Sequence, residues 1–234
     1  MVEFESIREN LKRIEYNISE AAAKRSAGGG VKVLLATKTV DTERILFAAD
    51  VLGYRLVGEN RVGELLSKYD AIKDHTDVHL IGHLQTNKVK SVVGKVSLIE
   101  SVDSIRLAKE IDKVSASAGI ITDVLVEINI GKEESKGGVM PEAADEFFSE
   151  LSELGSVRPV GVMTMAPRCE IKTDYNKYFS KTYQIFLDIS QKYLYNIIEP
   201  VLSMGMSESY EEAVAEGATE IRLGSAVFGS RVYP

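Results

Sequence analysis

The sequence contains one cysteine, Cys169, among 234 residues. A single thiol excludes an internal disulfide, a zinc site built from several cysteines and a Cys-x-x-Cys redox pair. No stretch approaches the ~20 apolar residues that span a bilayer. The first ten residues, MVEFESIREN, carry acids where a secretory signal needs a basic region. These absences predict a soluble protein of the reducing cytoplasm.

Positive charge is also scarce. Lys and Arg number 28 against 35 Asp and Glu, so the formal net charge is -7 and the isoelectric point is near 5.2. Such a surface repels nucleic-acid phosphates and anionic lipids, and no block of Lys and Arg is long enough to override that repulsion. We therefore expect neither nucleic acid nor a membrane as a partner.

Short apolar runs alternate with longer amphipathic stretches along the chain. Eight short runs predict strands: VKVLLAT, YRLVG, DVHLIG, VSLIES, DVLVEINI, PVGVMTM, EPVLSMG and EIRLG. Stretches between them, such as ERILFAADVLG and SIRLAKEIDKVSASAG, predict helices. Such alternation is typical of parallel strands joined by crossover helices, and eight units closing on themselves form an α/β fold, the (β/α)8 TIM barrel. An open doubly wound sheet is the alternative, but no G-x-G-x-x-G follows the first strand.

An additional helix is predicted before the first strand. Apolar residues recur there at helical spacing: Phe4, Ile7, Leu11, Ile14 and Ile18. We expect an amphipathic helix over roughly residues 3 to 25, closed by the glycines at 28–30. The chain is then one domain, 1–234, with residues 1–28 forming a helix packed on the barrel.

In a barrel of this kind the working site lies at the carboxyl ends of the strands. Polar residues collect at these predicted ends: Lys38, Glu59 and Asn60, Gly82 and His83, Glu100 and Ser101, Asn129, 203–207 and 222–225. Methionines that end other strands, Met206 among them, are expected to line the core and the pocket because thioethers fill irregular gaps.

Lys38 follows a strand that is otherwise apolar. An amine held beside apolar walls is partly desolvated, so its pKa falls and it can attack a carbonyl to form an imine. A lysine that extends its ammonium group into solvent explains the same spacing. The position of Lys38 alone does not decide between the two interpretations.

The last two predicted strands suggest an anion site. They lead into LSMGMSESYEEAVAEG and EIRLGSAVFGSR, where Gly205 allows close approach of the backbone and Gly224 and Ser225 can offer free amides. Ser209 with Glu212 fits a capping box. Ordinary loop glycines and helix caps are the alternative account. Combined with an imine-forming lysine, these loops point to an aldehyde that carries a phosphate.

At this point the sequence resembles a known family. The segments ATKTV, VGEN, HLIGHLQTNKVK, SVDS, VEINIGKEESKGG, VGVMTM, LSMGMS and IRLGSAVFGSR match those of the pyridoxal 5'-phosphate homeostasis proteins, which are built like the N-terminal barrel of alanine racemase. The resemblance covers nearly the whole chain after the first helix and implies a pyridoxal phosphate fold of type III. MSES and ATK depart slightly from the commoner family sequences.

The resemblance implies a set of cofactor-binding residues. The lysine matching Lys38 holds pyridoxal 5'-phosphate as an internal aldimine, Arg222 faces the pyridine nitrogen, and Ser207, Gly224 and Ser225 hold the phosphate. By the same resemblance His83 lines the pocket, and a rim histidine hydrogen-bonded to the backbone is the alternative. The complete predicted set is Lys38, Asn60, His83, Met206, Ser207, Arg222, Gly224 and Ser225. No catalytic residue is predicted.

A cation facing the ring nitrogen disfavours its protonation, so the cofactor is a weak electron sink. Racemases of this fold add a tyrosine from a second domain of a partner subunit, whereas this chain stops at Pro234, just after the eighth strand. We therefore expect a monomer that buffers the cofactor and delivers it to apo-enzymes. The alternatives are an amino-acid racemase and a Schiff-base aldolase that acts on a sugar phosphate.

Two further motifs have simpler explanations. His75, His79 and His83 are spaced by four residues, but on a strand this spacing separates side chains by about 13 Å, too far for one metal ion. We therefore predict no metal site. The polar loop GKEESKGG contains Lys136, which could pair with a phosphate or accept the cofactor during transfer. A solvated loop explains the same residues.

Overall fold

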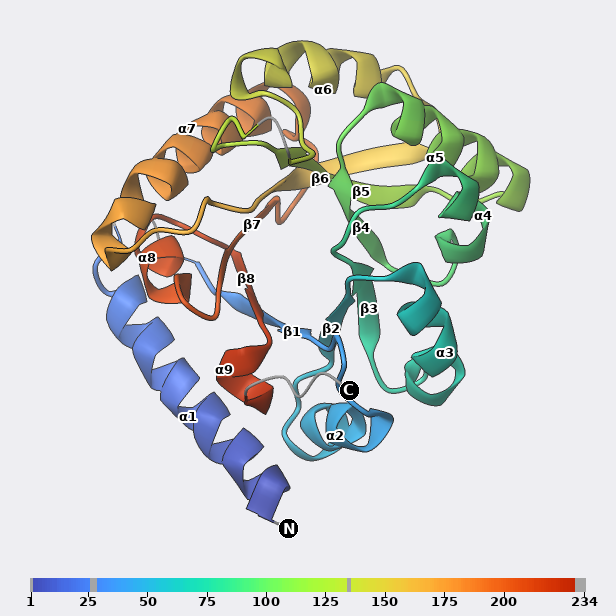
Figure 1. Ribbon diagram of the computed structural model, residues 1–234. Coiled ribbons are helices and arrows are strands. Elements are labelled where there is room, and N and C mark those ends of the chain that lie inside the picture. Colours follow the sequence, from blue (N-terminus) through green and yellow to red (C-terminus); the bar gives the residue numbers. More distant parts are fainter. Residues whose placement is uncertain (1, 26–28, 134–135, 230–234) are drawn as a thin grey trace.

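The computed structural model describes residues 2–25, 29–133 and 136–229. Parallel strands form a closed barrel in chain order, β1 to β8 (Figure 1). The strands are β1 Lys32–Ala36, β2 Leu56–Glu59, β3 Asp77–Leu80, β4 Leu98–Val102, β5 Thr122–Ile128, β6 Val157–Thr164, β7 Val201–Met206 and β8 Glu220–Leu223. The β1–β8 pairing, with Leu35 opposite Leu223, closes the barrel. The predicted α/β TIM barrel is confirmed, and the open sheet is wrong.

Helices form a ring around the strands (Figure 1). They are α1 Val2–Ala22, α2 Thr42–Leu46, α3 Val62–Ile72, α4 Val89–Val92, α5 Ile105–Ala118, α6 Ala144–Ser152, α7 Tyr175–Tyr193, α8 Tyr210–Ala215 and α9 Ser225–Phe228. Short helices of other types are η1 Phe47–Val51, η2 Thr86–Lys88, η3 Pro141–Ala143 and η4 Lys172–Asp174. The helix predicted from ERILFAADVLG is therefore two segments, because α2 passes into the π-helical η1. Within the described ranges, none of the helices combines the length and apolar character needed to cross a membrane.

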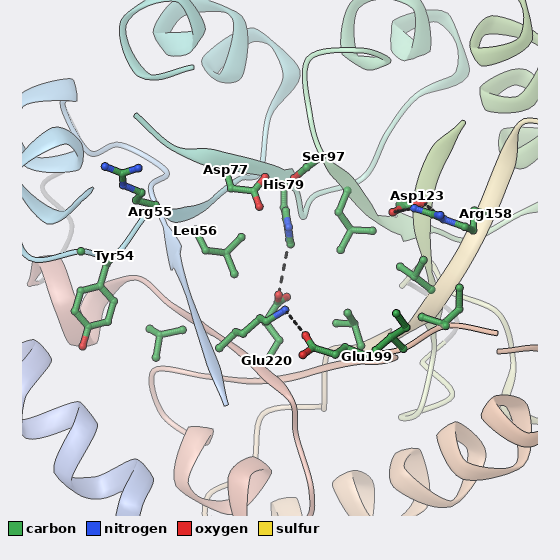
Figure 2. A pocket seen from close by; sticks show the side chains of 18 of the residues that line it. Tyr54, Arg55, Leu56, Asp77, His79, Ser97, Asp123, Arg158, Glu199 and Glu220 are labelled. Atoms are coloured by element: carbon green, nitrogen blue, oxygen red, sulfur yellow. Dashed lines mark hydrogen bonds and ion pairs between the residues drawn. The ribbon is translucent and has the colours of Figure 1, made fainter. Parts of the chain in front are cut away.

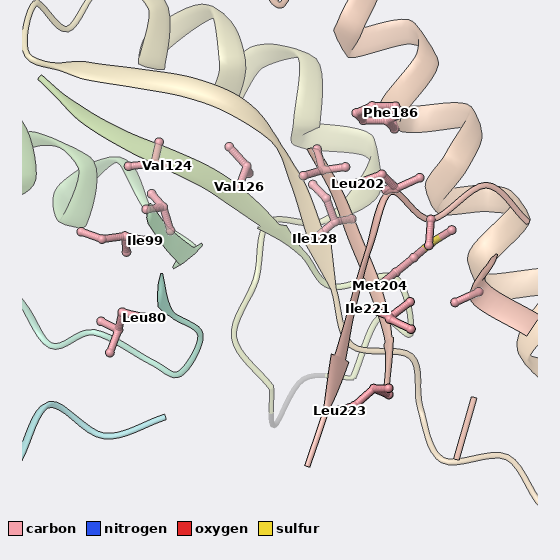
Figure 3. Packing of buried hydrophobic residues seen from close by; sticks show 14 of the residues in the cluster. Leu80, Ile99, Val124, Val126, Ile128, Phe186, Leu202, Met204, Ile221 and Leu223 are labelled. Carbon is pink, nitrogen blue, oxygen red and sulfur yellow. The ribbon is translucent and has the colours of Figure 1, made fainter. Parts of the chain in front are cut away.

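The main core lies between the barrel wall and the surrounding helices. Strand residues such as Val126, Leu202 and Ile221 belong to it, and Phe186 of α7 reaches them from the helix layer (Figure 3). Because side chains alternate along a strand, the intervening residues face the inside of the barrel. Two separate apolar clusters occupy that interior: Leu34, Ala36 and Ile81, and Leu98, Leu125, Val160 and Met163.

Helix α1 runs along the outside of the barrel and packs against α8 and α9 (Figure 1). Asn10 Nδ2 donates a hydrogen bond to the Val227 carbonyl at 2.9 Å, and Asn17 Nδ2 donates one to the Tyr210 hydroxyl at 2.8 Å. The helix ends at Ala22. The glycines predicted to close it occupy 28–30, and the first of them, Gly28, lies outside the described residues.

Candidate functional site

The predicted cofactor-binding residues lie on β1, β2, β3, β7 and β8 or directly after them. Lys38 follows β1, Asn60 follows β2 and the exposed His83 follows β3. Met206 ends β7 and is paired in register with Arg222 of β8. Since these strands are neighbours and parallel, their carboxyl ends meet on one side of the barrel. The structure thus places the predicted set around one rim.

Ser207 joins the loop after β7 to the loop after β8. Its Oγ accepts hydrogen bonds from the backbone amides of Gly224, at 3.3 Å, and Ala226, at 3.1 Å. Ser225 lies between them and is exposed. One hydroxyl and two backbone amides therefore converge at the rim, and all three can donate to an anion.

Gly205 allows the end of β7 to lie close to α8. Its φ of +90° lies in the region that favours glycine, and a Cβ there would come within 2.5 Å of the Ala213 Cβ in α8. The predicted capping box is wrong, because the Ser209 hydroxyl makes no cap to α8 and instead accepts from the Met206 amide at 3.3 Å. The turn between β7 and α8 is consequently held by its own serine.

Arg222 is buried inside the barrel, with 4% of its surface exposed. Its Nη1 donates to the Ser203 hydroxyl at 2.7 Å, and its Nη2 donates to the Thr164 carbonyl at 2.8 Å. The Glu100 carboxylate lies 4.0 Å from Nη1 and offsets part of the cost of burying the charge. Both terminal nitrogens are engaged, so the plane of the guanidinium group is fixed.

A buried network continues from Arg222 deeper into the barrel. Ser203 Oγ lies 2.7 Å from a Glu100 oxygen and 3.0 Å from a Glu220 oxygen. The His79 ring lies 2.8 Å from Glu100 and 3.9 Å from Glu220. This cluster was not predicted from the sequence. Its signal is a glutamate at an inward-facing position of a barrel strand, as at Glu100 in β4 and Glu220 in β8.

The two carboxyl groups of this network titrate differently. Burial and the neighbouring Glu100 charge raise the pKa of Glu220 to about 8. Burial opposes ionisation of Glu100 as well, but the hydrogen bond from His79 and the charges of His79 and Arg222 hold the pKa of Glu100 below its ordinary value. The same contact with Glu100 raises the pKa of His79 against the effect of burial. Glu100 therefore carries the negative charge and Glu220 retains its proton.

The three histidines pair with different acids. His75 lies 2.8 Å from Asp50, and His83 lies 3.3 Å from Asp103. Ligand atoms of His79, Glu100 and Glu220 lie within 4.8 Å of one another, a spacing that a metal ion could bridge. Hydrogen bonds and the retained proton of Glu220 already satisfy these groups, and Arg222 supplies a cation beside them.

The loop that contains Lys136 is organised by Asn129. The side-chain amide of Asn129 donates to the carbonyl oxygens of Glu133, at 2.9 Å, and Lys136, at 3.3 Å. Lys136 Nζ pairs with the Glu133 carboxylate at 2.7 Å and is 45% exposed. Residues 134–135 lie outside the described residues. In the described conformation Lys136 is engaged within its own loop.

A cavity of about 750 Å³ opens at the opposite, amino-terminal end of the barrel (Figure 2). Lys32, Asp77 and Glu220, the first residues of their strands, line it, and His79 faces Glu220 within it. None of the eight predicted cofactor-binding residues lines this cavity. Active sites in such barrels lie at the carboxyl ends of the strands, so the rim with Lys38 is the candidate functional site.

The geometry defines a parallel eight-stranded barrel with a lysine, a buried arginine and a serine-amide turn at one rim. The family model for the alanine racemase N-terminal domain matches residues 10–232. An alanine racemase from Clostridium difficile has the same fold, with a TM-score of 0.74 at 16% identity, over 95% of this chain and 59% of that one. The class is therefore the alanine racemase type of barrel.

Closer relatives narrow the class. The pyridoxal phosphate homeostasis protein of Aquifex aeolicus is 44% identical over 227 residues, which cover 96% of this chain and 98% of the relative. PipY of Synechococcus elongatus, solved with PLP bound, is 29% identical with a TM-score of 0.80, over 95% of this chain and 100% of that one. The chain belongs to the pyridoxal phosphate homeostasis protein family.

Proposed function

We propose that this protein binds pyridoxal 5'-phosphate covalently through Lys38, buffers the free aldehyde and delivers it to apo-enzymes that require it. The observation that carries the proposal is the convergence of a lysine, a buried arginine and a turn of serine and backbone amides on neighbouring strands at one rim. The names of the relatives, and the PLP bound to PipY, support the same cofactor.

The donors at the rim fit a phosphorylated aldehyde. The Ser207 hydroxyl and the amides of Gly224 and Ala226 provide three hydrogen-bond donors for the phosphate once the hydroxyl rotates toward it. Asn60, His83, Met206 and Ser225 complete the proposed binding set around the ring. Lys38, a half-buried residue, provides the amine. When bound, pyridoxal phosphate supplies an aldehyde that forms a reversible covalent link with amines.

Arg222 favours a carrier over an amino-acid enzyme. Its guanidinium group is held in place by contacts with Ser203, Thr164 and Glu100. It therefore presents a cation where the family resemblance puts the pyridine nitrogen. A cation there opposes protonation of the ring and weakens its capacity to withdraw electrons.

Lys38→Ala tests the proposal. The wild-type protein incubated with pyridoxal phosphate should show a visible absorption band, and borohydride reduction should fix a pyridoxyl group on Lys38 that peptide mass spectrometry locates. Lys38→Ala should lose both, whereas the control Lys136→Ala should keep the adduct. A colourless wild-type protein, or an adduct spread over many lysines, would contradict the proposal.

Delivery is tested with a cofactor-free enzyme. The loaded protein should restore activity to an apo-enzyme that depends on pyridoxal phosphate, and turnover of alanine by the protein itself should be absent. We further propose that residues 1–234 act as one domain and as a monomer in the cytoplasm. Light scattering at micromolar concentration should then give a mass close to 25.7 kDa.

A further inference from the structure

Lys38 lies in a turn whose backbone is held from outside the barrel. The Thr37 carbonyl accepts from the Val40 amide at 2.9 Å, which closes a turn around Lys38 and Thr39. Thr39 has a φ of +64°, a strained conformation for a β-branched residue. Such a turn persists only where its surroundings hold it.

Lys68 of α3 provides one of the holding contacts. Its Nζ donates to the Thr37 carbonyl at 2.8 Å and pairs with the carboxylates of Glu59, at 3.0 Å, and Glu64, at 2.7 Å. Only 11% of the Lys68 side chain is exposed. A buried ammonium group bonded to three acceptors is held in one position, because each contact restricts the same nitrogen.

Glu64 and Glu59 complete the arrangement on either side of Lys38. The Glu64 carboxylate accepts a hydrogen bond from the Thr39 amide, and Glu59 Oε1 accepts one from the Thr37 hydroxyl at 2.7 Å. Burial raises the pKa of Glu59, whereas the hydrogen bonds from Lys68 and Thr39 hold the pKa of Glu64 below its ordinary value despite its burial. The other oxygen of Glu59, Oε2, is buried with no hydrogen-bond partner in the described part of the chain. Both carboxyl groups thus pair with the same cation, Lys68.

Lys38 itself has no comparable contacts. Among the residues that the structure describes, none forms a hydrogen bond or an ion pair with its amine. The turn from Thr37 to Val40 therefore fixes the point on the rim from which the Lys38 side chain extends. A reacting group displaced by about 1 Å can lose on the order of 100-fold in reactivity, so the stiffness of this turn matters for covalent attachment.

We infer that Lys68, together with Glu64 and Glu59, is a positioning residue that fixes the turn bearing Lys38 and thereby directs its amine toward the aldehyde. This inference rests on the proposed function, because it assigns a role in covalent attachment at the same site. Attachment joins the Lys38 nitrogen to the aldehyde carbon and releases the carbonyl oxygen as water. Lys68 touches neither reacting atom and acts through the backbone of Thr37.

Lys68→Met is the test, because it removes the ammonium group and keeps most of the aliphatic volume. Two ligands separate positioning from general damage: pyridoxal 5'-phosphate, which can link to Lys38, and pyridoxine 5'-phosphate, which has an alcohol in place of the aldehyde. We expect Lys68→Met to weaken binding of pyridoxal phosphate by about 10-fold or more and to leave binding of pyridoxine phosphate within about 2-fold. The rate at which the visible band forms should fall in parallel.

Two further variants accompany Lys68→Met, one as a control and one as a second test. Lys73→Met, at the end of the same helix, removes an exposed lysine that pairs with Asp70 at 3.3 Å and should change neither ligand. Glu64→Ala removes the acceptor of the Thr39 amide at a less buried position and should repeat the selective loss if Lys68→Met does not fold. Circular dichroism and the unfolding midpoint report whether each variant retains the barrel.

Three results would overturn the inference. Lys68→Met and Glu64→Ala could bind pyridoxal phosphate as the wild type does, or they could lose both ligands in equal proportion, which indicates a structural role only. If the wild-type protein itself forms no borohydride-fixed adduct on Lys38, the proposed function fails and this inference fails with it. An intact Lys38 adduct together with unaffected variants rejects the inference alone.

Discussion

In the proposed site, the Ser207 hydroxyl has a role both before and after a phosphate binds. Its oxygen accepts from the amides of Gly224 and Ala226, which would otherwise lie at the rim without a protein partner. A phosphate oxygen can take over both amides, and the hydroxyl then becomes a third donor to it. The exchange replaces hydrogen bonds and leaves no donor unsatisfied.

Ser207→Ala should therefore affect both stability and binding. Loss of the acceptor should lower the free energy of unfolding by about 1 kcal/mol, and loss of one donor should weaken pyridoxine 5'-phosphate binding by about 10-fold. Urea denaturation and calorimetric titration measure the two effects. Ser19→Ala, at an exposed position of α1, is the control and should change neither. Unchanged binding by Ser207→Ala would remove Ser207 from the proposed site.

Gly205 imposes a second local requirement. An alanine there would adopt a φ of +90° and bring its Cβ within 2.5 Å of Ala213. Gly205→Ala should lower the free energy of unfolding by roughly 1–3 kcal/mol, or more if α8 shifts, and should weaken phosphate-ester binding. Gly63→Ala in α3 is the matched control, since its Cβ would meet nothing within 4 Å. Equal urea midpoints for the two variants would contradict this account.

At the scale of elements, α1 supports the helices that frame the anion-binding turn. It packs against α8, which follows β7, and α9, which follows β8. Asn10 and Asn17 tie it to Val227 and Tyr210 of these helices. The N-terminal helix is thus expected to stabilise the phosphate end of the rim even though it contributes no residue to it.

Ile14→Ala tests this support. Ile14 is 1% exposed and belongs to the main core, so truncation should lower the free energy of unfolding by about 2–5 kcal/mol. Pyridoxine phosphate should bind more weakly as well, because the braced helices carry the amides of the turn. The exposed Lys12→Ala on the same helix should leave both quantities unchanged. A destabilised Ile14→Ala variant with normal ligand affinity would show that α1 supports the fold without supporting the site.

The strands were predictable because most of them are short apolar runs. The set of residues at the rim could then be predicted, because parallel strands in chain order bring their carboxyl ends together. Alternation along β8, for example, already places Arg222 and Glu220 on one face. The contact of Glu220 with His79 and Ser203 was not predictable, since it depends on the stagger between strands distant in sequence. Two local features were not predicted: the change from α2 to the π-helical η1 at Phe47, and the hydrogen bond from the Met206 amide to the Ser209 hydroxyl. At both places packing determines the structure more than local sequence preference does.

At the scale of the whole molecule, the apolar core between strands and helices surrounds a network of charged and polar side chains inside the barrel. The polar network begins at the buried side chains of His79 and Glu220, which line the cavity at the amino-terminal end (Figure 2). Through Ser203 it reaches Arg222. Ionised Glu100 balances Arg222, and protonated Glu220 adds no second negative charge. The protonation of Glu220 is therefore a property of the folded barrel that the unfolded chain does not share.

The pH dependence of stability should report this proton. Glu220 has a pKa of about 8 in the folded protein, against 4.5 as the ordinary value, so between these pH values the folded state binds a proton that the unfolded chain has lost. Its contribution to the free energy of unfolding therefore falls as pH rises through that range and falls no further above it. The raised pKa of His79 acts in the same direction, so the contribution of Glu220 must be isolated by substitution.

Glu220→Gln mimics the protonated carboxyl group and cannot ionise. The variant should gain stability relative to the wild type as pH rises from about 5 to about 8, with a constant difference above that, as measured by urea denaturation at several pH values. Glu199→Gln, at an exposed position of the same cavity, should follow the wild-type curve. Parallel pH curves for Glu220→Gln and the wild type would mean that Glu220 is ionised in the folded barrel. Arg222 would then be balanced by two carboxylates, and its charge would no longer oppose protonation of the cofactor ring as argued.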